Sequence, residues 1–308
     1  MSWQPLSLDP FRHLALVYDS GDDYLAGTLP YIQAGLVTNE PVMVVVDRPK
    51  IDLLRAELGG AAARVRWVDM RGVGANPARI IPLWRQFVAA HPGRPLRGIG
   101  EPIWPGQSPE HRVEAQRHEL LLNLAFAASP GLAIMCPYDA SRLDPDVVEE
   151  ARRSHQHVRQ DVLERPGEAA LAARAALDAA LTPAPGGTPE VAFDEPSPLL
   201  LRRLVEAPIR EAGLATGRAD DLALALSAAA TSLARFGGRL LARCWREQGA
   251  VLAEVLSTRR IEDPLLGREW PPTDAGRGLW AANQLTDLGE LRSSAAGTVV
   301  RLRVQARS

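Results

Sequence analysis

Between residues 11 and 139, short apolar runs alternate with longer stretches of helical periodicity. The apolar runs are mostly continuous, as in strands that are buried on both faces, and the helical stretches between them suit crossover connections. The pattern predicts a doubly wound, mainly parallel α/β sheet. Its expected strands are 14–18, 41–46, 64–68, 96–99 and 132–136, and its expected helices are 22–36, 49–58, 77–90 and 109–128.

The remaining sequence predicts a connecting region and a second domain. A long helix is expected from residue 145, with a break at Pro166-Gly167 before an alanine-rich stretch, and the clearest linker is Thr-Pro-Ala-Pro-Gly-Gly-Thr-Pro at 182–189. Helices near 199–212 and 221–234, two strands flanking 247–249, a helix at 279–285 and a final hairpin ending in strand 298–304 predict a two-layer α/β sandwich. We therefore expect domains at 8–160 and 191–306, joined by a helix and linker at 161–190.

Composition narrows the possible functions. A formal net charge of -2 argues against direct nucleic-acid binding, which normally uses a strongly basic face. No apolar stretch reaches eighteen residues and the N-terminus lacks the pattern of a signal peptide, so neither membrane insertion nor export is expected. The two cysteines, Cys136 and Cys244, fall in different predicted domains, which favours a cytoplasmic location. Lys50 is the one lysine of the chain, which leaves none in the region of the second domain where a nucleotide pocket is considered below.

The first predicted domain lacks a phosphate-binding loop. Its first strand runs into Tyr18-Asp-Ser-Gly-Asp-Asp23, an acidic turn at the place where a phosphate loop would be rich in glycine and carry a lysine. A nucleotide phosphate would be repelled there.

Four motifs in order resemble the MEDS domain, a sensory module found in signalling proteins. They are His13-Leu-Ala-Leu-Val-Tyr-Asp19, Gly100-Glu-Pro-Ile-Trp-Pro-Gly106, His118-Glu-Leu-Leu-Leu-Asn-Leu-Ala-Phe126 and Cys136-Pro-Tyr-Asp139. The resemblance covers roughly residues 10 to 160. It implies a RecA-like fold without a phosphate loop and the sensing of a small molecule, whose identity it does not give.

These motifs are expected to converge at one edge of the sheet. Asp19, Glu101 and Asp139 each follow a predicted strand, and the carboxyl ends of parallel strands form the binding crevice of open α/β sheets. Tyr and Trp side chains can line one side of such a crevice with an apolar ring and place a polar O–H or N–H toward the ligand. The expected sensory crevice consists of Tyr18, Asp19, Glu101, Trp104, His118, Glu119, Asn123, Tyr138 and Asp139.

Structural interpretations of some of these residues stay open. Glu101 and His118 can equally form a buried polar pair that fixes the sheet to a helix. Cys136 ends a buried strand and is interpreted as a packed thiol rather than a nucleophile. His155 and His157, beside several arginines, suggest metal or cyclic-dinucleotide binding, but they are interpreted as a solvated helix face because no third ligand has diagnostic spacing. No metal site is expected.

The second domain resembles the anti-sigma-factor type of serine kinase in the GHKL ATPase superfamily. The resemblance rests on the helix that begins Asp221-Leu-Ala-Leu-Ala-Leu-Ser227, on Ile261-Glu-Asp-Pro-Leu-Leu-Gly-Arg268 and on Gly276-Arg-Gly-Leu-Trp280. The family's catalytic Glu is replaced by Ala228, its metal-binding Asn by Ser232 and its adenine-binding Asp by Ser257. The resemblance therefore implies a pseudokinase with no cofactor and with weak or lost binding of ATP and Mg²⁺. Its vestigial nucleotide pocket is expected at Ser227, Ala228, Ser232, Ser257, Arg259, Gly276 and Gly278.

Together these features predict a cytoplasmic signalling regulator. A small-molecule sensory domain would control the pseudokinase domain, which would bind a sigma factor or a STAS-type anti-sigma antagonist. A homodimer is expected through a helical region at 145–181, where alanines and leucines allow close approach: Leu163, Ala170, Leu171, Ala175, Leu177 and Leu181. Two alternatives remain: an active ATP-dependent serine kinase that uses Ser232 and Ser257, and a dimeric small-molecule-binding protein.

Overall fold

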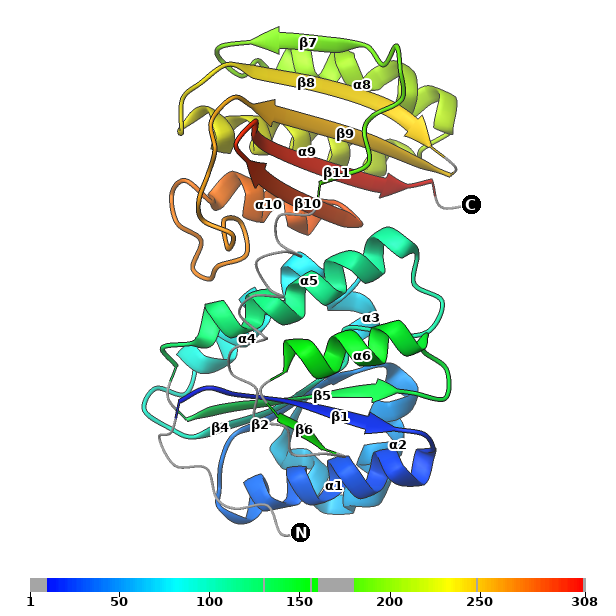
Figure 1. The fold of residues 1–308 in the computed structure, drawn as a ribbon, viewed down its shortest axis with the longest axis vertical. Coiled ribbons are helices and arrows are strands. Elements are labelled where there is room, and N and C mark those ends of the chain that lie inside the picture. Colours follow the sequence, from blue (N-terminus) through cyan, green and yellow to red (C-terminus); the bar gives the residue numbers. More distant parts are fainter. Residues whose placement is uncertain (1–9, 130, 156, 160–179, 248, 307–308) are drawn as a thin grey trace. The chain divides into compact units, whose positions relative to one another are not determined.

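The computed structural model describes residues 10–129, 131–155, 157–159, 180–247 and 249–306. The chain forms two compact units (Figure 1). Of the described residues, the first unit contains those up to Ala75 and those from Leu83 to Arg159. The second contains Asn76–Pro82 and the residues from 180 onward.

The first unit is built on a six-stranded parallel sheet, in the order β3-β2-β4-β5-β1-β6. The parallel α/β sheet predicted from the apolar runs is confirmed. Four of its strands are buried along almost their whole length, as their apolar sequences require. The strands are β1 Arg12–Tyr18, β2 Val42–Val46, β3 Val65–Asp69, β4 Leu96–Gly100, β5 Leu132–Asp139 and β6 His157–Arg159.

Helices cover both faces of this sheet (Figure 1). The helices α1 (Gly21–Val37) and α2 (Arg48–Leu58) pack on one face, and α4 (Ile80–Ala89), α5 (Pro109–Phe126) and α6 (Pro145–Ser154) lie on the other. Ser20, Asp47 and Ser108 begin α1, α2 and α5 by accepting a hydrogen bond from a backbone N–H of the first turn. The short elements η1 (Gly59–Arg64) and α3 (Met70–Val73) complete the connections of this unit, and η2 (Pro77–Arg79) belongs to the second unit.

The core of the first unit shows why the layers lie where they do. On the α1 and α2 face, Tyr31, Ile32 and Leu54 pack against alternate valines of β2. On the other face, Trp84 of α4 lies against Gly98, where a Cβ atom would come within 2.6 Å of the indole ring. A glycine at this position of β4 is therefore required for close packing of helix on sheet.

The connection after β5 differs from the prediction. The long helix expected from residue 145 ends at Ser154, and residues 157–159 form β6, which pairs with β1. The part of the expected dimer helix from 160 to 179, including Leu163, Ala170, Leu171, Ala175 and Leu177, lies outside the described residues.

The second unit is a two-layer sandwich with an antiparallel sheet in the order β10-β11-β9-β8-β7. The strands are β7 Glu190–Phe193, β8 Leu240–Glu247, β9 Ala250–Ser257, β10 Leu288–Ser294 and β11 Gly297–Gln305. Helices α8 (Pro198–Ala212), α9 (Thr216–Ala234) and α10 (Arg277–Leu285) form the other layer (Figure 1). The predicted helices and the two hairpins are confirmed, whereas β7 was not predicted.

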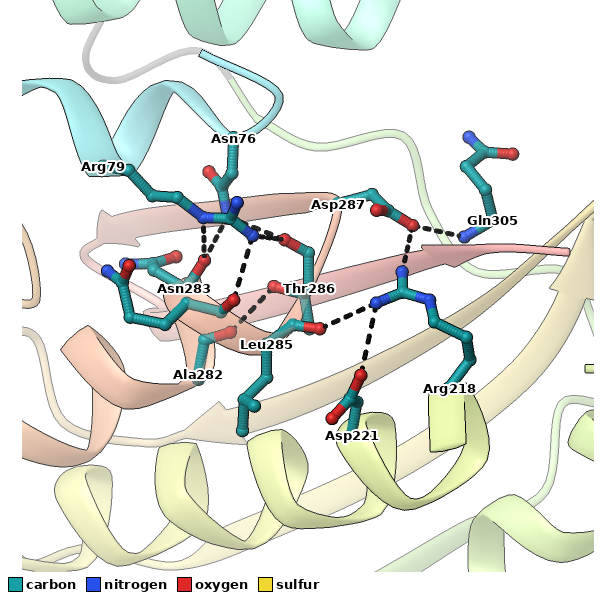
Figure 2. Close-up of polar contacts among 11 residues, drawn as sticks. Asn76, Arg79, Arg218, Asp221, Ala282, Asn283, Leu285, Thr286, Asp287 and Gln305 are labelled. Carbon is teal, nitrogen blue, oxygen red and sulfur yellow. Dashed lines mark hydrogen bonds and ion pairs between the residues drawn. The ribbon is translucent and has the colours of Figure 1, made fainter. Parts of the chain in front are cut away.

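The core of the second unit lies between this sheet and its helices, around Leu226 and Ala229 of α9 and Val255 of β9. Figure 2 shows polar contacts that connect the start of α9 to the segment between α10 and β10. The Arg218 guanidinium bridges Asp287, Asp221 and the carbonyl of Leu285.

The end of α10 is capped within the same unit. Asn76 Nδ2 and Arg79 Nε donate to the carbonyl of Asn283 at 3.1 and 2.8 Å, and Arg79 also reaches the carbonyl of Thr286 at 2.7 Å (Figure 2). These donors satisfy carbonyls that have no partner inside the helix. Within the described residues, no helix combines the length and apolar character needed to span a bilayer.

Candidate functional site

The topology of the first unit fixes where a ligand can enter. Strand β2 is followed by α2 on one face of the sheet, whereas its neighbour β4 is followed by α5 on the other face. The connections diverge there, so this pair of strands is a topological switch point, where open α/β sheets leave a crevice at their carboxyl edge. Lys50 enters this edge from the first turn of α2, and Glu101 directly follows β4.

A polar group occupies this edge, and we call Tyr18, Tyr24, Lys50 and Glu101 the Glu101 group. Glu101 Oε1 lies 2.5 Å from Lys50 Nζ and accepts a hydrogen bond of 3.1 Å from the Tyr18 hydroxyl. Lys50 Nζ also lies 5.5 Å from the ring centroid of Tyr18 and 5.4 Å from that of Tyr24, within range of cation–π attraction. Lys50 retains 22% side-chain exposure, so the group borders on solvent.

Burial controls the protonation of this group. It raises the pKa of Glu101 to about 7, because the loss of hydration outweighs the attraction of the Lys50 ammonium. Burial, followed by the charges of Glu101 and Asp139, raises the pKa of Tyr18 above its ordinary range. The group therefore combines a cation and phenol donors with a carboxyl that changes charge near neutral pH, which suits recognition of a small polar molecule.

A second polar group lies on the opposite face of the sheet, under α5 and α6. Successive side chains of a strand point to opposite faces, so His13 and Tyr18 of β1 project to different sides. His13, Glu119, Cys136 and His155, which we call the histidine–cysteine group, are all buried. The Nε2 atoms of both histidines lie 3.0 Å from Glu119 Oε2, and His13 Nε2 lies 3.3 Å from Cys136 Sγ.

Burial also dominates the electrostatics of the histidine–cysteine group. It lowers the pKa of His13 to about 4, assisted by the nearby His155 ring. Burial and then the adjacent Glu119 carboxylate raise the pKa of the Cys136 thiol well above its ordinary value. Cys136 is thus a protonated thiol in this environment and is unsuited to act as a nucleophile.

The residues predicted to line one crevice are divided between these two faces. Tyr18 and Glu101 belong to the Glu101 group, whereas Glu119 belongs to the histidine–cysteine group. Asn123 and Tyr138 adjoin this second group: Asn123 Oδ1 is 3.1 Å from His13 Nδ1, and the Tyr138 ring meets that of His155 edge-on at 5.6 Å. The predicted residues therefore lie on two faces of the sheet and not at one place, because the alternation of β1 and β5 side chains separates the two sets.

The other predicted residues occupy the periphery. Asp19 is exposed, and Asp139 at the end of β5 accepts a hydrogen bond of 2.6 Å from Ser141. Trp104 is half-buried, with the Arg71 guanidinium 4.5 Å from its ring centroid. His118 is buried on α5, one position before Glu119.

Two site features were missed or misread from the sequence. Lys50 was not predicted, although it follows a buried strand by four residues, which is the same signal that selected Glu101. The interpretation of His155 as part of a solvated helix face was also wrong, because its side chain is buried and contacts Glu119. An isolated histidine inside an apolar strand, as at His13, was the available signal for a buried partner.

In the second unit, the positions of the expected nucleotide pocket contact one another. Ser227, Ala228 and Ser232 lie on α9, and Gly276 caps the start of α10. The Leu279 N–H donates to Ser232 Oγ at 3.2 Å. A Cβ atom on Gly278 would lie 2.2 Å from the carbonyl oxygen of Ala228.

Ser257 lies elsewhere in this unit. Ser257 Oγ accepts from the N–H of Arg259 at 3.1 Å and lines a cavity of about 380 Å³ at the end of the sheet. None of the α9 and α10 positions lines that cavity. The positions that were expected to surround a nucleotide therefore do not gather around one cavity.

A doubly wound sheet with a polar group at its switch point is typical of α/β domains that bind ligands. Residues 12–156 match the family model of the MEDS domain, the methanogen/methylotroph, DcmR sensory domain. The match spans β1 to α6 and includes both polar groups, and it indicates a sensor or signalling role for this part of the chain. No curated protein matches the chain.

Proposed function

We propose that this chain is a cytoplasmic signalling regulator in which the MEDS domain binds a small molecule at the Glu101 group. The observation that carries the proposal is the position of this group at the switch point between β2 and β4, inside the segment that matches a sensory family. The partly exposed Lys50 is available to a ligand acceptor, and the buried carboxyl of Glu101 can accept from or donate to the ligand according to its protonation.

The second unit would then act by binding a protein rather than by phosphorylation. An antiparallel sheet with three helices on one face is consistent with a GHKL-like sandwich. The absence of a carboxylate at Ala228 and the close packing of Gly278 on α9 both support a pseudokinase. Its proposed partner is a sigma factor or a STAS-type antagonist, and the proposed assembly is a homodimer.

Native mass spectrometry of the full chain, purified from its host, tests the sensory part of the proposal. The wild-type protein is expected to retain a small molecule of constant mass, and Glu101→Gln is expected to retain less because it lacks the carboxylate that orders Lys50 and Tyr18. Glu57→Gln, an exposed change on α2, serves as the matched control. Equal retention by all three proteins, or no retained molecule in any of them, would exclude the Glu101 group as the sensory site.

A further inference from the structure

The histidine–cysteine group brings four metal-ligating side chains to one point. They come from four separate places in the first unit: β1, α5, β5 and the residue that follows α6. All four side chains are buried, and their ligating atoms lie within 4.8 Å of one another. Imidazole, thiolate and carboxylate donors within a sphere of this size can form a tetrahedral metal site.

The surroundings of His13 determine which of its ring nitrogens faces the cluster. Its Nδ1 lies 3.1 Å from Asn123 Oδ1. The orientation of that amide is fixed on its other side, because Asn123 Nδ2 donates to the carbonyl of Ser154 at 3.0 Å. Asn123 Oδ1 is therefore an acceptor, His13 Nδ1 carries the hydrogen, and Nε2 of the neutral ring directs a lone pair toward Glu119 and Cys136.

His155 is held in the same tautomer by the backbone. Its Nδ1 lies 2.8 Å from the carbonyl oxygen of Ala151, which can only accept a hydrogen bond. The Nδ1 hydrogen is thereby fixed, and the Nε2 lone pair faces Glu119 Oε2 at 3.0 Å. Two imidazole lone pairs and a carboxylate oxygen thus point at one buried region, where a bound cation would satisfy all three.

We propose that His13, Glu119, Cys136 and His155 bind one divalent metal ion of the zinc type. Binding forms bonds from the metal to Nε2 of each imidazole, to a Glu119 oxygen and to Cys136 Sγ, and the thiol proton leaves to solvent. The thiolate and the carboxylate together supply two negative charges, which balance a divalent ion in a site with no access to water. The soft sulfur and nitrogen donors favour Zn²⁺ over Mg²⁺ or Ca²⁺.

Four protein ligands without an open position make this a structural site rather than a catalytic one. The metal ties α5 and the end of α6 to the two neighbouring strands β1 and β5. Asn123 and the Ala151 carbonyl are positioning groups, since each fixes the ring of a ligand without reaching the metal. The site lies on the face of the sheet opposite to the α1 and α2 layer and is independent of the proposed sensory ligand.

Cobalt substitution of the full chain tests this proposal. Cys136→Ser removes a proposed ligand, and Cys244→Ser is the matched control. Reduced protein is stripped with a chelator and titrated with Co²⁺ and then Zn²⁺. The wild-type protein and Cys244→Ser are expected to bind one equivalent and to show thiolate-to-cobalt charge transfer with the intense visible bands of tetrahedral Co²⁺. Cys136→Ser is expected to lose the charge-transfer band. A wild-type protein that takes up neither ion, or an unchanged band in Cys136→Ser, overturns the proposal.

A second variant keeps the test decisive if Cys136→Ser fails to fold. Asn123→Ala leaves all four ligands in place but removes the acceptor for His13 Nδ1. It is expected to keep the tetrahedral cobalt spectrum and to bind Zn²⁺ about 10- to 100-fold more weakly than the wild-type protein, as is usual for the loss of a ligand-orienting group. An unchanged affinity contradicts the assigned tautomer of His13, and the absence of a tetrahedral cobalt spectrum in Asn123→Ala contradicts the metal site.

Discussion

Glu101 is a carboxylic acid in surroundings that disfavour its charge. Its side chain is 4% exposed and meets one cation, Lys50, and one phenol, Tyr18. These contacts offset only part of the lost hydration, so burial leaves the pKa at about 7. A group poised in this way links the stability of the first unit to pH.

The direction of this pH dependence follows from the difference between the pKa of Glu101 in the folded state and that of the free side chain. The pKa of Glu101 is about 7 in the folded state and 4.5 for the free side chain. Between these values the folded state binds more protons, so the free energy of unfolding falls as pH rises from about 4.5 to 7, by roughly 3 kcal/mol in total. Glu101→Gln is expected to lack this decrease. Urea unfolding at several pH values, followed by hydrogen exchange in β1 and β4, measures it.

The relevant quantity is the difference between wild type and variant, because other groups of the first unit also titrate in this range. Glu57→Gln, whose side chain is exposed on α2, should keep the wild-type dependence. If Glu101→Gln and wild type lose stability in parallel across this pH range, Glu101 does not carry the linkage.

At the residue scale, the sequence predicted individual residues of the candidate site better than it predicted the residues that they contact. Glu101 was predicted because it follows a strand, but its partner Lys50 was not, since no pattern connects two residues that are far apart in the chain. Similarly, Cys136 is buried, as its place in an apolar strand predicts, while its contact with His13 depends on the register of β1 against β5. Pairings of this kind are set by tertiary structure, which a single sequence does not encode in its local periodicity.

Among the elements, the longer strands were predictable, including the edge strands β3 and β10, whereas the short edge strands β6 and β7 were not. Strands such as β2 are long apolar runs, because both of their faces are buried. The edge strands β6 and β7 have three and four residues, and β7 is exposed at every second position. Such short strands carry little hydrophobic signal, so the helix expected after residue 145 was extended through β6.

The packing of α10 on α9 gives a prediction at this scale. A Cβ atom on Gly278 would lie 2.2 Å from the Ala228 carbonyl and 2.7 Å from Ser232 Oγ, and helix backbone cannot yield as a flexible side chain can. Gly278→Ala is expected to destabilise the second unit by about 1–3 kcal/mol through overpacking. Urea unfolding with hydrogen exchange in α9 and α10 measures the change.

Gly217 in the first turn of α9 is the matched control. A Cβ atom there meets no atom within 4 Å, and its backbone is compatible with alanine. Gly217→Ala should therefore be neutral or stabilise the unit by up to about 1 kcal/mol. A Gly278→Ala protein as stable as this control would show that the two helices do not pack closely in solution.

At the scale of the whole molecule, the two units have separate cores and different types of sheet. The proposal assigns binding of a small molecule to the first unit and binding of a protein to the second. The parallel sheet of the first unit places the Glu101 group at its carboxyl edge, a position that suits a small ligand. The second unit covers one face of its antiparallel sheet with α8, α9 and α10. The expected nucleotide positions on α9 and α10 contact one another there, and Ser257 lies elsewhere, so the proposed activity of this unit depends on a protein surface.

Measuring nucleotide binding by the full chain distinguishes the proposed pseudokinase from an active kinase. In an active GHKL-type site, charged hydrogen bonds to adenine and to the metal are each worth about 1.5–3 kcal/mol. In the proposed pseudokinase, Ser257 and Ser232 stand in place of the groups that would make them, and Ser232 Oγ already accepts from the N–H of Leu279. We therefore expect calorimetric titration with ATP and Mg²⁺ to show a Kd no tighter than roughly millimolar.

A restored variant makes the same experiment specific. Ala228→Glu with Ser232→Asn returns two of the residues of the resembled family, yet binding is expected to stay weak. In this variant Gly278 still packs on the backbone of residue 228. Ser257 still stands where the resembled family has its adenine-binding carboxylate, and Arg259 is still two residues further on. Saturable, Mg²⁺-dependent heat at micromolar ATP in the wild-type protein would instead mean that α10 moves away from α9 to admit a nucleotide, and the second unit would then have to be treated as a kinase.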